Sequence, residues 1–326
     1  MTTATTATPV DFEAYGDYGS AMTAPKGTSF ERPRYPFRGR IGSDRFPAEA
    51  GRYHIYASYA CPWAQRSLIV RRLKGLEEAV SVGIVDPVRD GRGWAFRDGD
   101  GHGPDTVGGF TLLREAYEAT EPGYDGHISV PVLWDTQTRR IVSNNFPDIT
   151  MDLNSCFNAW AAHGIDLYPQ GLRSEIDELN RKVYATVNNG VYRCGFAPTQ
   201  EAYNNAVLGS RSYLLGDTIT EADVRLWVTL VRFDTVYATH FKTNIRRLVD
   251  YPNLWGYTRD LYALPAFRET TDFDHIKRHY YTTHGALNPK RIVPAGPVLD
   301  FSAPHDRARL SERDPHAQVV SPRPAG

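Results

Sequence analysis

The amino-acid sequence predicts an α/β domain followed by an all-helical domain, and three observations lead to this fold class. The chain has 326 residues, of which 41% are hydrophobic and 23% charged, as in an ordinary two-domain globular protein. Strand patterns alternate with helix patterns over residues 51–160, and only helical patterns follow from about Arg173. We therefore expect an extended N-terminal arm over 1–50, an α/β domain over 51–160, a helical domain over 170–285, and a C-terminal extension with a loose tail over 286–326.

The first half of the α/β region consists of two strand-then-helix units. Tyr53–Ser58 has the alternation of a strand, and Cys61-Pro62 begins a helix whose apolar residues recur on one side. Val80–Val85 is a second, β-branched strand, followed by a long loop over Pro87–Gly109 and a helix over Leu112–Ala119. Units of this kind place successive strands in parallel.

A hairpin and a helix complete the α/β region. Ser129–Trp134 and Arg140–Ser143 flank a polar turn that begins at Asp135, and a helix begins near Pro147. Parallel crossovers that end in a hairpin give a small mixed sheet covered by helices. The predicted arrangement is thioredoxin-like.

The helical region contains one clear start signal. Thr220 can cap a helix, Asp223 can reach back to the same turn, and Ile219 can pack on Val224. Helix capping alone accounts for this motif, so we assign it no catalytic role. The tail over 303–326 is rich in Pro, Arg and His, and we expect it to be loose.

The charge balance excludes several classes of partner. Lys and Arg number 37 and Asp and Glu 38, which gives a net charge of -1. Such a chain offers no basic surface for nucleic acid or anionic lipid. No apolar run approaches the length of a membrane span, and the N-terminus lacks a signal-peptide pattern. We expect a cytoplasmic protein that acts on small molecules.

The three cysteines do not form the pattern of a disulfide framework or a zinc site. Cys61 lies where a strand leads into a helix, so its sulfur is expected at the helix N-terminus, a setting that favours the thiolate. Ala64 stands where a dithiol motif has its second cysteine, so the chemistry is expected to be monothiol. The alternative is that Cys61 is a small buried hydrophobe. We assign that structural role to Cys156, within a predicted helix, and to Cys194, in a predicted turn.

The pair Val130-Pro131 is the second local signal. A proline inside an apolar strand removes a hydrogen-bond donor from the sheet, so it needs either an edge strand or a special peptide bond. A cis peptide is one solution and a trans proline on an edge strand is the other. In the cis case the backbone of Val130 would face Cys61 and could pair with a peptide-like thiol.

Taken together, five sequence blocks resemble the glutathionyl-hydroquinone reductases, the Xi class of glutathione transferases. The resemblance extends from about residue 37 to 297. The blocks are Tyr59–Arg66, Gly93-Trp94, Ser129–Asp135, Val187–Tyr192 and Phe273–Ile276. It implies a thioredoxin-like N-terminal domain, an all-helical C-terminal domain, and a homodimer. It also implies reduction of an aromatic hydroquinone conjugate with a low-molecular-weight thiol, normally glutathione, as co-substrate.

The resemblance also implies roles for individual residues. Cys61 would attack the thioether sulfur, the hydroquinone would leave, and a second thiol would resolve the mixed disulfide. Trp94 would stack over the bound thiol, and the Val130-Pro131 pair would contact its backbone. Tyr192 and Tyr280 would line the hydroquinone site, and Trp255 stands where the family has a further tyrosine. For each aromatic residue taken singly, the alternative is ordinary core packing.

One departure from the family pattern concerns thiol recognition. The family has Ser-Asn-Glu-Ser at the end of the hairpin, whereas this chain has Ser143 followed by Asn144, Asn145 and Phe146. We expect these last three residues to contact the thiol. Loss of a carboxylate that pairs with a ligand ammonium costs about 2–5 kcal/mol of binding. The hypothesis is that the thiol is mycothiol, with Phe146 packing on one of its rings; the alternative is that Asn145 still binds glutathione weakly.

A second departure is a helix that is shortened between Val207 and Leu208. His275 and His279 lie one helical turn apart, but no third ligand is apparent, so we expect both to face solvent and predict no metal. Besides the reductase, two functions stay open. One is a conventional conjugating glutathione transferase, which normally uses a Ser or Tyr hydroxyl. The other is a non-catalytic module that retains the transferase fold.

Overall fold

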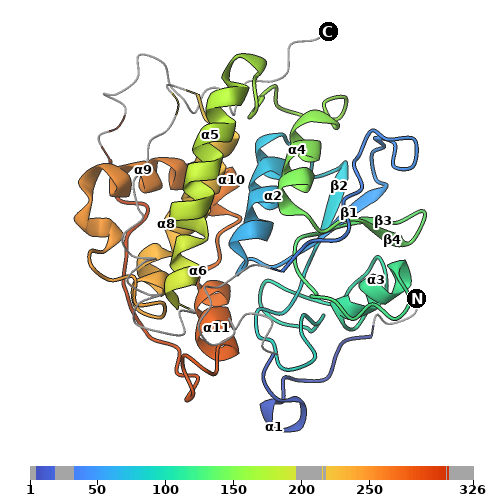
Figure 1. Ribbon diagram of the computed structural model, residues 1–326, viewed down its shortest axis with the longest axis horizontal. Coiled ribbons are helices and arrows are strands. Elements are labelled where there is room, and N and C mark those ends of the chain that lie inside the picture. The colour runs from blue at the N-terminus through green and yellow to red at the C-terminus, as the bar shows by residue number, and fades with distance from the viewer. Residues whose placement is uncertain (1–4, 19–32, 196–214, 216–217, 306, 308–326) are drawn as a thin grey trace. The chain divides into compact units, whose positions relative to one another are not determined.

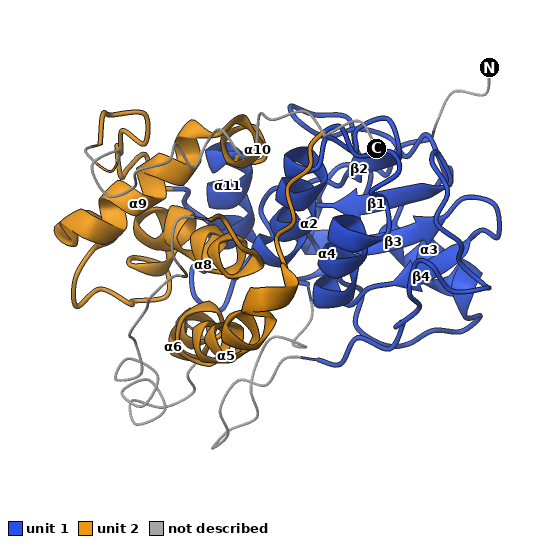
Figure 2. Cartoon of the chain, turned by 90° about the horizontal axis from the view of Figure 1, so that it is seen from above, with its two compact units in different colours: residues 1–19, 33–162, 272–293 blue, residues 20–32, 163–271, 294–326 orange. Residues whose placement is uncertain are grey.

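The chain forms two compact units in the computed structural model, which describes residues 5–18, 33–195, 215, 218–305 and 307 (Figures 1 and 2). Unit 1 comprises residues 1–19, 33–162 and 272–293, and unit 2 comprises residues 20–32, 163–271 and 294–326. Both units are therefore assembled from segments that lie far apart in the sequence.

The core of unit 1 is a four-stranded mixed sheet with the strand order β2-β1-β3-β4. β1 (Tyr53–Ala57) pairs in parallel with β2 (Val80–Ile84), and β3 (Val132–Asp135) is antiparallel to both β1 and β4 (Arg140–Ser143). All five residues of β1 are buried, as expected of a central strand covered on both faces. The predicted mixed, thioredoxin-like sheet is confirmed, but the second predicted parallel crossover is wrong, because β3 runs antiparallel to β1.

Helices cover the two faces of this sheet. α2 (Pro62–Leu73) and α4 (Phe146–Ser155) pack against each other on one face, and α3 (Leu113–Thr120) lies on the other (Figures 1 and 2). Each helix begins within one residue of its predicted start. The segment over 87–109 that precedes α3 contains no helix or strand, as predicted.

The predicted N-terminal arm is more structured than its composition indicated. Residues 12–15 form the short helix α1 (Phe12–Tyr15), whose N-cap Asp11 accepts hydrogen bonds from two backbone N–H groups. Farther along, the Gly39 N–H donates to the Val142 carbonyl at 2.9 Å, and Arg40 pairs with the buried carboxylate of Asp152 at 2.6 Å. Contacts between residues more than 100 positions apart thus fix the Gly39-Arg40 part of this arm to the rest of unit 1.

Unit 2 is helical in the residues that the structure describes. Among the described residues its longest helices are α5 (Arg173–Val183), α8 (Glu221–Arg232) and α9 (Pro252–Ala263). Its shorter helical segments are η2 (Gln170–Leu172), η3 (Tyr184–Asn188), α6 (Gly190–Gly195), η4 (Phe233–Tyr237), η5 (Leu248–Asp250) and α10 (Pro265–Arg268). The predicted shortened helix at Val207 lies outside the described residues.

The predicted start of α8 is confirmed. The backbone N–H of Thr220 donates to Asp223 Oδ2 at 2.7 Å, which is the capping-box contact. The hydroxyl of Tyr257 donates to the other oxygen of the same carboxylate at 3.0 Å. Burial raises the pKa of Asp223 above its ordinary value, although these hydrogen bonds oppose the rise.

The domain boundaries predicted from the sequence differ from the two units at the C-terminal end. α11 (Phe273–Thr283) belongs by its contacts to unit 1, not to the helical region over 170–285. The start of the predicted loose tail is also anchored, because the Pro304 carbonyl accepts from Arg259 at 2.8 Å and His305 lies 3.5 Å from Asp260. Local composition could not reveal these long-range contacts.

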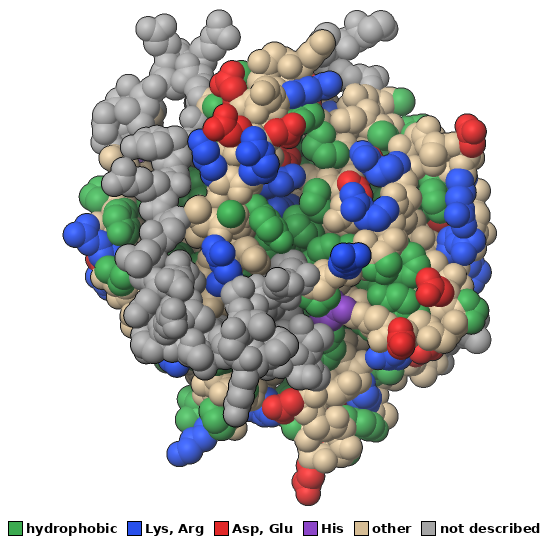
Figure 3. All heavy atoms as spheres, in the orientation of Figure 1, with side chains coloured by type: hydrophobic (Ala, Val, Ile, Leu, Met, Phe, Trp, Pro, Cys, Tyr) green, Lys and Arg blue, Asp and Glu red, His purple; other side chains and the backbone are tan. Residues whose placement is uncertain are grey.

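Two further features are the distribution of charge on the surface and the lengths of the helices. Basic and acidic side chains are interspersed over the face shown in Figure 3. Among the described residues, no helix combines the length and the apolar character needed to span a membrane.

Candidate functional site

Cys61 occupies the N-cap position of α2, directly after the β1 strand and a short turn. The Gln65 N–H donates to the Cys61 carbonyl at 3.0 Å, which closes the first turn of the helix. Pro62 is the first helical residue, where the missing N–H of proline costs nothing. The Cys61 side chain is partly exposed. The predicted placement of this sulfur at a helix N-terminus is therefore confirmed, and the positive end of the helix dipole favours a thiolate there.

The segment before β3 faces this cysteine. The Val130-Pro131 peptide bond is cis, so of the two interpretations the cis one is correct. The Cys61 thiol donates to the Val130 carbonyl oxygen at an Sγ–O distance of 3.5 Å. The structure thus brings Cys61 close to the Val130-Pro131 pair, the two local signals that the sequence contains.

Tyr117 on α3 ties this segment to the end of the hairpin. Its hydroxyl donates to the Ser129 carbonyl at 2.9 Å, and the Ser129 N–H and the Asn144 side-chain amide donate to it at 3.1 and 3.3 Å. Tyr117 is fully buried, and burial raises the pKa of its phenol well above the ordinary value. The sequence offered no signal for this link, because the three residues come from separate elements.

Asn144 and Asn145 lie between β4 and α4. The side chain of Asn144 is only 1% exposed, and its amide oxygen accepts from the Phe37 N–H at 3.2 Å. Asn145 is the N-cap of α4, and its backbone N–H donates to the Ser143 hydroxyl at 3.1 Å. The nearest acid in this helix turn, Asp148, is engaged by Arg38 at 2.6 Å. Contact of Asn144 and Asn145 with a thiol stays a prediction.

The ring of Phe146 packs against other side chains of the protein. It packs on Trp63 with a centroid distance of 4.6 Å, and the guanidinium of Arg66 lies over both rings, at 4.5 Å from Trp63 and 5.1 Å from Phe146. Tyr35 approaches the same ring edge-on at 5.7 Å. The hypothesis that Phe146 offers a free face to a thiol ring loses support, because Phe146 is buried by these neighbours.

Trp94 is held in the long loop between β2 and α3. Its side chain is 4% exposed, the guanidinium carbon of Arg89 lies 4.2 Å from its ring centroid, and the ring of His279 stacks on it at 5.2 Å and 13°. The preceding Gly93 has a φ of +86°, a conformation that residues with a side chain rarely adopt. The predicted role of Trp94 in stacking over a thiol is not decided by these contacts.

The three residues predicted to line a hydroquinone site lie in both units. Tyr280 on α11 belongs to unit 1, is 2% exposed, and contacts His284 at a centroid distance of 5.5 Å. Tyr192 belongs to unit 2 and packs edge-on against Phe241 at 5.4 Å. Trp255, also in unit 2, packs on Phe301 at 4.9 Å. Tyr192 and Trp255 thus have different aromatic neighbours, and their shared role stays a prediction.

The expectation that His275 and His279 face solvent is wrong, because both are buried. His275 Nε2 lies 2.7 Å from the Asp100 carbonyl and His279 Nδ1 lies 2.7 Å from the Pro87 carbonyl. Since a carbonyl oxygen only accepts, each of these ring nitrogens donates. The two histidines therefore bind α11 to the loop that carries Trp94. In the part of the chain that the structure describes, no three His, Cys, Asp or Glu side chains are grouped so as to hold a metal ion.

The other two cysteines have the surroundings of structural residues. Cys156 is the C-cap of α4 and its thiol donates to the Ile41 carbonyl at 3.3 Å. Cys194 lies in helix α6, not in the predicted turn, and it is buried. Burial raises the pKa of both thiols, that of Cys194 to about 11, which keeps them protonated and unreactive.

The structure combines a thioredoxin-like sheet with a helical unit. A cysteine lies at the N-terminus of the first long helix, next to a cis-proline segment. This combination defines a protein of the glutathione-transferase type. The family described as "Glutathione S-transferase, C-terminal domain" matches residues 201–260. Glutathionyl-hydroquinone reductase YqjG of Escherichia coli is 45% identical over 87% of this chain and 94% of its own length. The chain belongs to this family, the glutathionyl-hydroquinone reductases or Xi-class glutathione transferases.

Solved structures agree with this assignment. The glutathione-bound structure of YqjG has a TM-score of 0.81 at 45% identity, over 84% of this chain and 97% of that chain. The crystal structure of the glutathione transferase Xi from Phanerochaete chrysosporium has the same TM-score of 0.81 and 45% identity, over 85% of this chain and 95% of that one. The predicted fold class, a thioredoxin-like domain with a transferase-like helical domain, is thereby confirmed.

Proposed function

We propose that this protein is a thiol-dependent reductase that removes a glutathionyl or related thiol group from S-conjugated hydroquinones. The Cys61 thiolate attacks the thioether sulfur, a disulfide forms between Cys61 and the thiol, and the carbon–sulfur bond to the ring breaks. The ring carbon takes the bonding electron pair and a proton, and leaves as hydroquinone. A second thiol then attacks the mixed disulfide, which regenerates Cys61 and releases the oxidised thiol dimer.

The single observation that carries this proposal is the place of Cys61. The sulfur lies at a helix N-terminus, 3.5 Å from the Val130 carbonyl, and it is partly exposed. Ala64 provides no second thiol in this helix turn, so release requires an outside thiol. An enzyme that only stabilises a bound thiolate for conjugation has no use for a nucleophilic cysteine, so the conjugating transferase is the weaker candidate. A non-catalytic module would give no reason for this placement.

Glutathione is the proposed co-substrate, with mycothiol as the alternative. A bound peptide-like thiol would pair with the backbone of Val130 beside Pro131 and lie against Trp94. Support for glutathione comes from the related YqjG, whose structure contains it. Support for mycothiol is narrower: Asn145 is neutral, and the nearby carboxylate of Asp148 already pairs with Arg38. A ligand ammonium therefore has no unengaged acid in this turn of α4.

Tyr192, Trp255 and Tyr280 are each proposed to contact the hydroquinone, and the support for this is the resemblance alone. Phenol hydroxyls can bind a quinol oxygen, and aromatic faces bury a flat ring. We further propose that the enzyme is a homodimer, as the resemblance implies, and that it acts in the cytoplasm.

A turnover assay tests the proposal. Hydroquinone release from glutathionyl- and mycothiyl-hydroquinone is measured by chromatography for the wild type, Cys61→Ser and Cys156→Ser. Release that requires Cys61 but not Cys156 supports the reductase. The variant Asn145→Glu/Phe146→Ser reports on the thiol, because a gain in glutathione affinity over the wild type favours mycothiol and equal affinity removes that alternative. No release with either conjugate contradicts the proposed function.

A further inference from the structure

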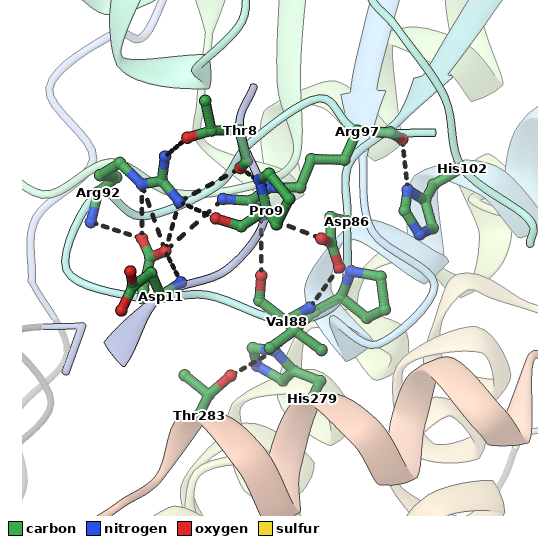
Figure 4. A network of polar contacts seen from close by, with 12 residues as sticks. Thr8, Pro9, Asp11, Asp86, Val88, Arg92, Arg97, His102, His279 and Thr283 are labelled. Atoms are coloured by element: carbon green, nitrogen blue, oxygen red, sulfur yellow. Dashed lines mark hydrogen bonds and ion pairs between the residues drawn. The ribbon is translucent and has the colours of Figure 1, made fainter. Parts of the chain in front are cut away.

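The N-terminal segment, residues 5–18, lies on the loop that carries Trp94. Arg92 donates to the Thr8 hydroxyl at 2.6 Å and to the Pro9 carbonyl at 2.7 Å, and Arg97 donates to the Thr8 carbonyl at 2.7 Å (Figure 4). The backbone N–H of Asp11 in turn donates to the Asp90 carboxylate at 3.1 Å. The segment is thus bound to the loop by charge-assisted hydrogen bonds at several points.

Tyr18, at the end of this segment, reaches Trp94 through one arginine. The guanidinium carbon of Arg89 lies 4.0 Å from the ring centroid of Tyr18 and 4.2 Å from that of Trp94. One buried cation therefore contacts both aromatic rings, in the geometry of a cation–π interaction. Displacing Tyr18 removes one of the aromatic contacts of Arg89. Since Arg89 also contacts Trp94, the position of Trp94 becomes less well fixed.

The hydroxyl of Tyr18 reaches the other segment of the thiol site. It donates to the Ile128 carbonyl at 3.2 Å, two residues before Val130. Its oxygen also lies 3.2 Å from His127 Nδ1. The ring and the hydroxyl of one residue thus contact both segments proposed to bind the thiol, the Trp94 loop and the strand entry at Val130.

His279 holds Trp94 independently of the N-terminal segment. Its ring stacks on the indole of Trp94, and its Nδ1 donates to the Pro87 carbonyl at 2.7 Å. Removing the Tyr18 contact should therefore loosen Trp94 and leave the loop attached to α11. A partial effect on ligand binding is expected, and not a loss of the fold.

We propose that Tyr18 is a positioning residue for thiol binding, which acts through Arg89 on Trp94 and through Ile128 on Val130. The inference rests on the proposed thiol-binding roles of Trp94 and Val130. It predicts a change in thiol affinity and not in the attack by Cys61, because β1 and α2 place that sulfur.

The test compares Tyr18→Leu, which removes ring and hydroxyl, with Tyr18→Phe, which removes the hydroxyl alone. Tyr15→Leu is the matched control. Tyr15 lies in the same segment, and its ring makes the same kind of cation–π contact, with the guanidinium carbon of Arg92 at 3.9 Å from the ring centroid. This contact is with Arg92 and not with Arg89, the arginine that contacts Trp94. Hydrogen–deuterium exchange is measured over residues 93–97 and 127–130. KM for glutathione and for mycothiol, and kcat, are measured with the matching conjugates.

For Tyr18→Leu we expect faster exchange in both segments and a thiol KM raised about 3–10-fold with kcat nearly unchanged, in keeping with a lost cation–π contact. Tyr18→Phe should restore slow exchange over 93–97 and most of the thiol affinity, and Tyr15→Leu should leave both segments and the KM as in the wild type. Unchanged exchange in Tyr18→Leu, the same change in Tyr15→Leu, or a fall in kcat at constant KM overturns the proposal. If the wild type turns over neither conjugate, the proposed function fails, and the exchange comparison still decides whether Tyr18 positions the two segments.

Discussion

Replacing Tyr117 with phenylalanine removes the hydroxyl that joins two segments of the proposed thiol site. That hydroxyl contacts the Ser129 carbonyl at 2.9 Å, the Ser129 N–H at 3.1 Å and the Asn144 amide at 3.3 Å. The phenylalanine ring retains the packing of the tyrosine ring against Phe37 and Tyr124. The substitution therefore removes hydrogen bonds and leaves the apolar contacts in place.

The cost follows from the groups that lose this partner. The Ser129 N–H and the Asn144 amide are left as donors in a buried environment, and each such donor costs about 1–3 kcal/mol, part of which local relaxation recovers. We expect Tyr117→Phe to lower the free energy of unfolding by about 2–3 kcal/mol, which corresponds to a fall in Tm of about 4–12 °C for a unit of this size. The thiol KM should rise as well, because Val130 follows Ser129 directly.

Thermal and urea unfolding, with the thiol KM measured in parallel, provide the assay. Tyr124→Phe is the control, because the Tyr124 hydroxyl makes one longer hydrogen bond, to the His127 carbonyl at 3.4 Å. A Tyr117→Phe protein within about 0.5 kcal/mol of the wild type, the usual range of a neutral surface change, refutes the reasoning. So does a loss no larger than that of Tyr124→Phe.

Three further predictions concern the two units separately. Burial alone would raise the pKa of Asp135, but hydrogen bonds from Arg52, at 2.7 and 3.0 Å, and from Thr138 hold it below its ordinary value. Because the pKa of Asp135 is lowered on folding, its ionised form stabilises the fold above the unfolded carboxyl's pKa of about 3.9, and this stabilisation is lost on acidification. Arg52→Met should therefore lower the free energy of unfolding by about 3–5 kcal/mol at pH 7. Urea titrations should show a progressively smaller loss as the pH falls below about 4. Thr220→Ala should lower the free energy of unfolding by about 1 kcal/mol or more through loss of the α8 cap, and Thr220→Ser, which keeps the hydroxyl but loses a buried methyl group, should lower it by less. Cys194 should resist a thiol reagent at pH 8 in the native protein and react after denaturation, because burial raises its pKa to about 11; rapid native labelling would contradict this.

The sheet and its helices could be predicted because their signals are local. Alternation, β-branched residues and turn residues identify β4 with the bounds that the structure has, Arg140–Ser143. The proline at position 62 and the preceding cysteine identify the start of α2 in the same way. The capping pair Thr220 and Asp223 likewise identifies α8, because its contacts span only three residues.

The rest of the site depends on contacts between distant segments, for which the sequence contains no local signal. Tyr18 meets Ile128, and His279 meets Pro87, across separations of 110 and 192 residues. The two histidines of α11 lie one helical turn apart, a spacing that does not reveal their burial by distant segments, which include Asp100, Pro87 and Tyr59. The turn predicted at Cys194 is wrong, because Cys194 lies within the helix α6 (Gly190–Gly195).

The central claim is that Cys61 forms a mixed disulfide with the thiol of a hydroquinone conjugate. The most direct measurement is the intact mass of the protein after single-turnover mixing with the conjugate, with peptide mapping of the adduct, for the wild type and Cys61→Ser. The account predicts one thiol adduct on Cys61, loss of the adduct on addition of free thiol, and release of one hydroquinone per protein. Hydroquinone release without an adduct at Cys61, or equal release by Cys61→Ser, would contradict it.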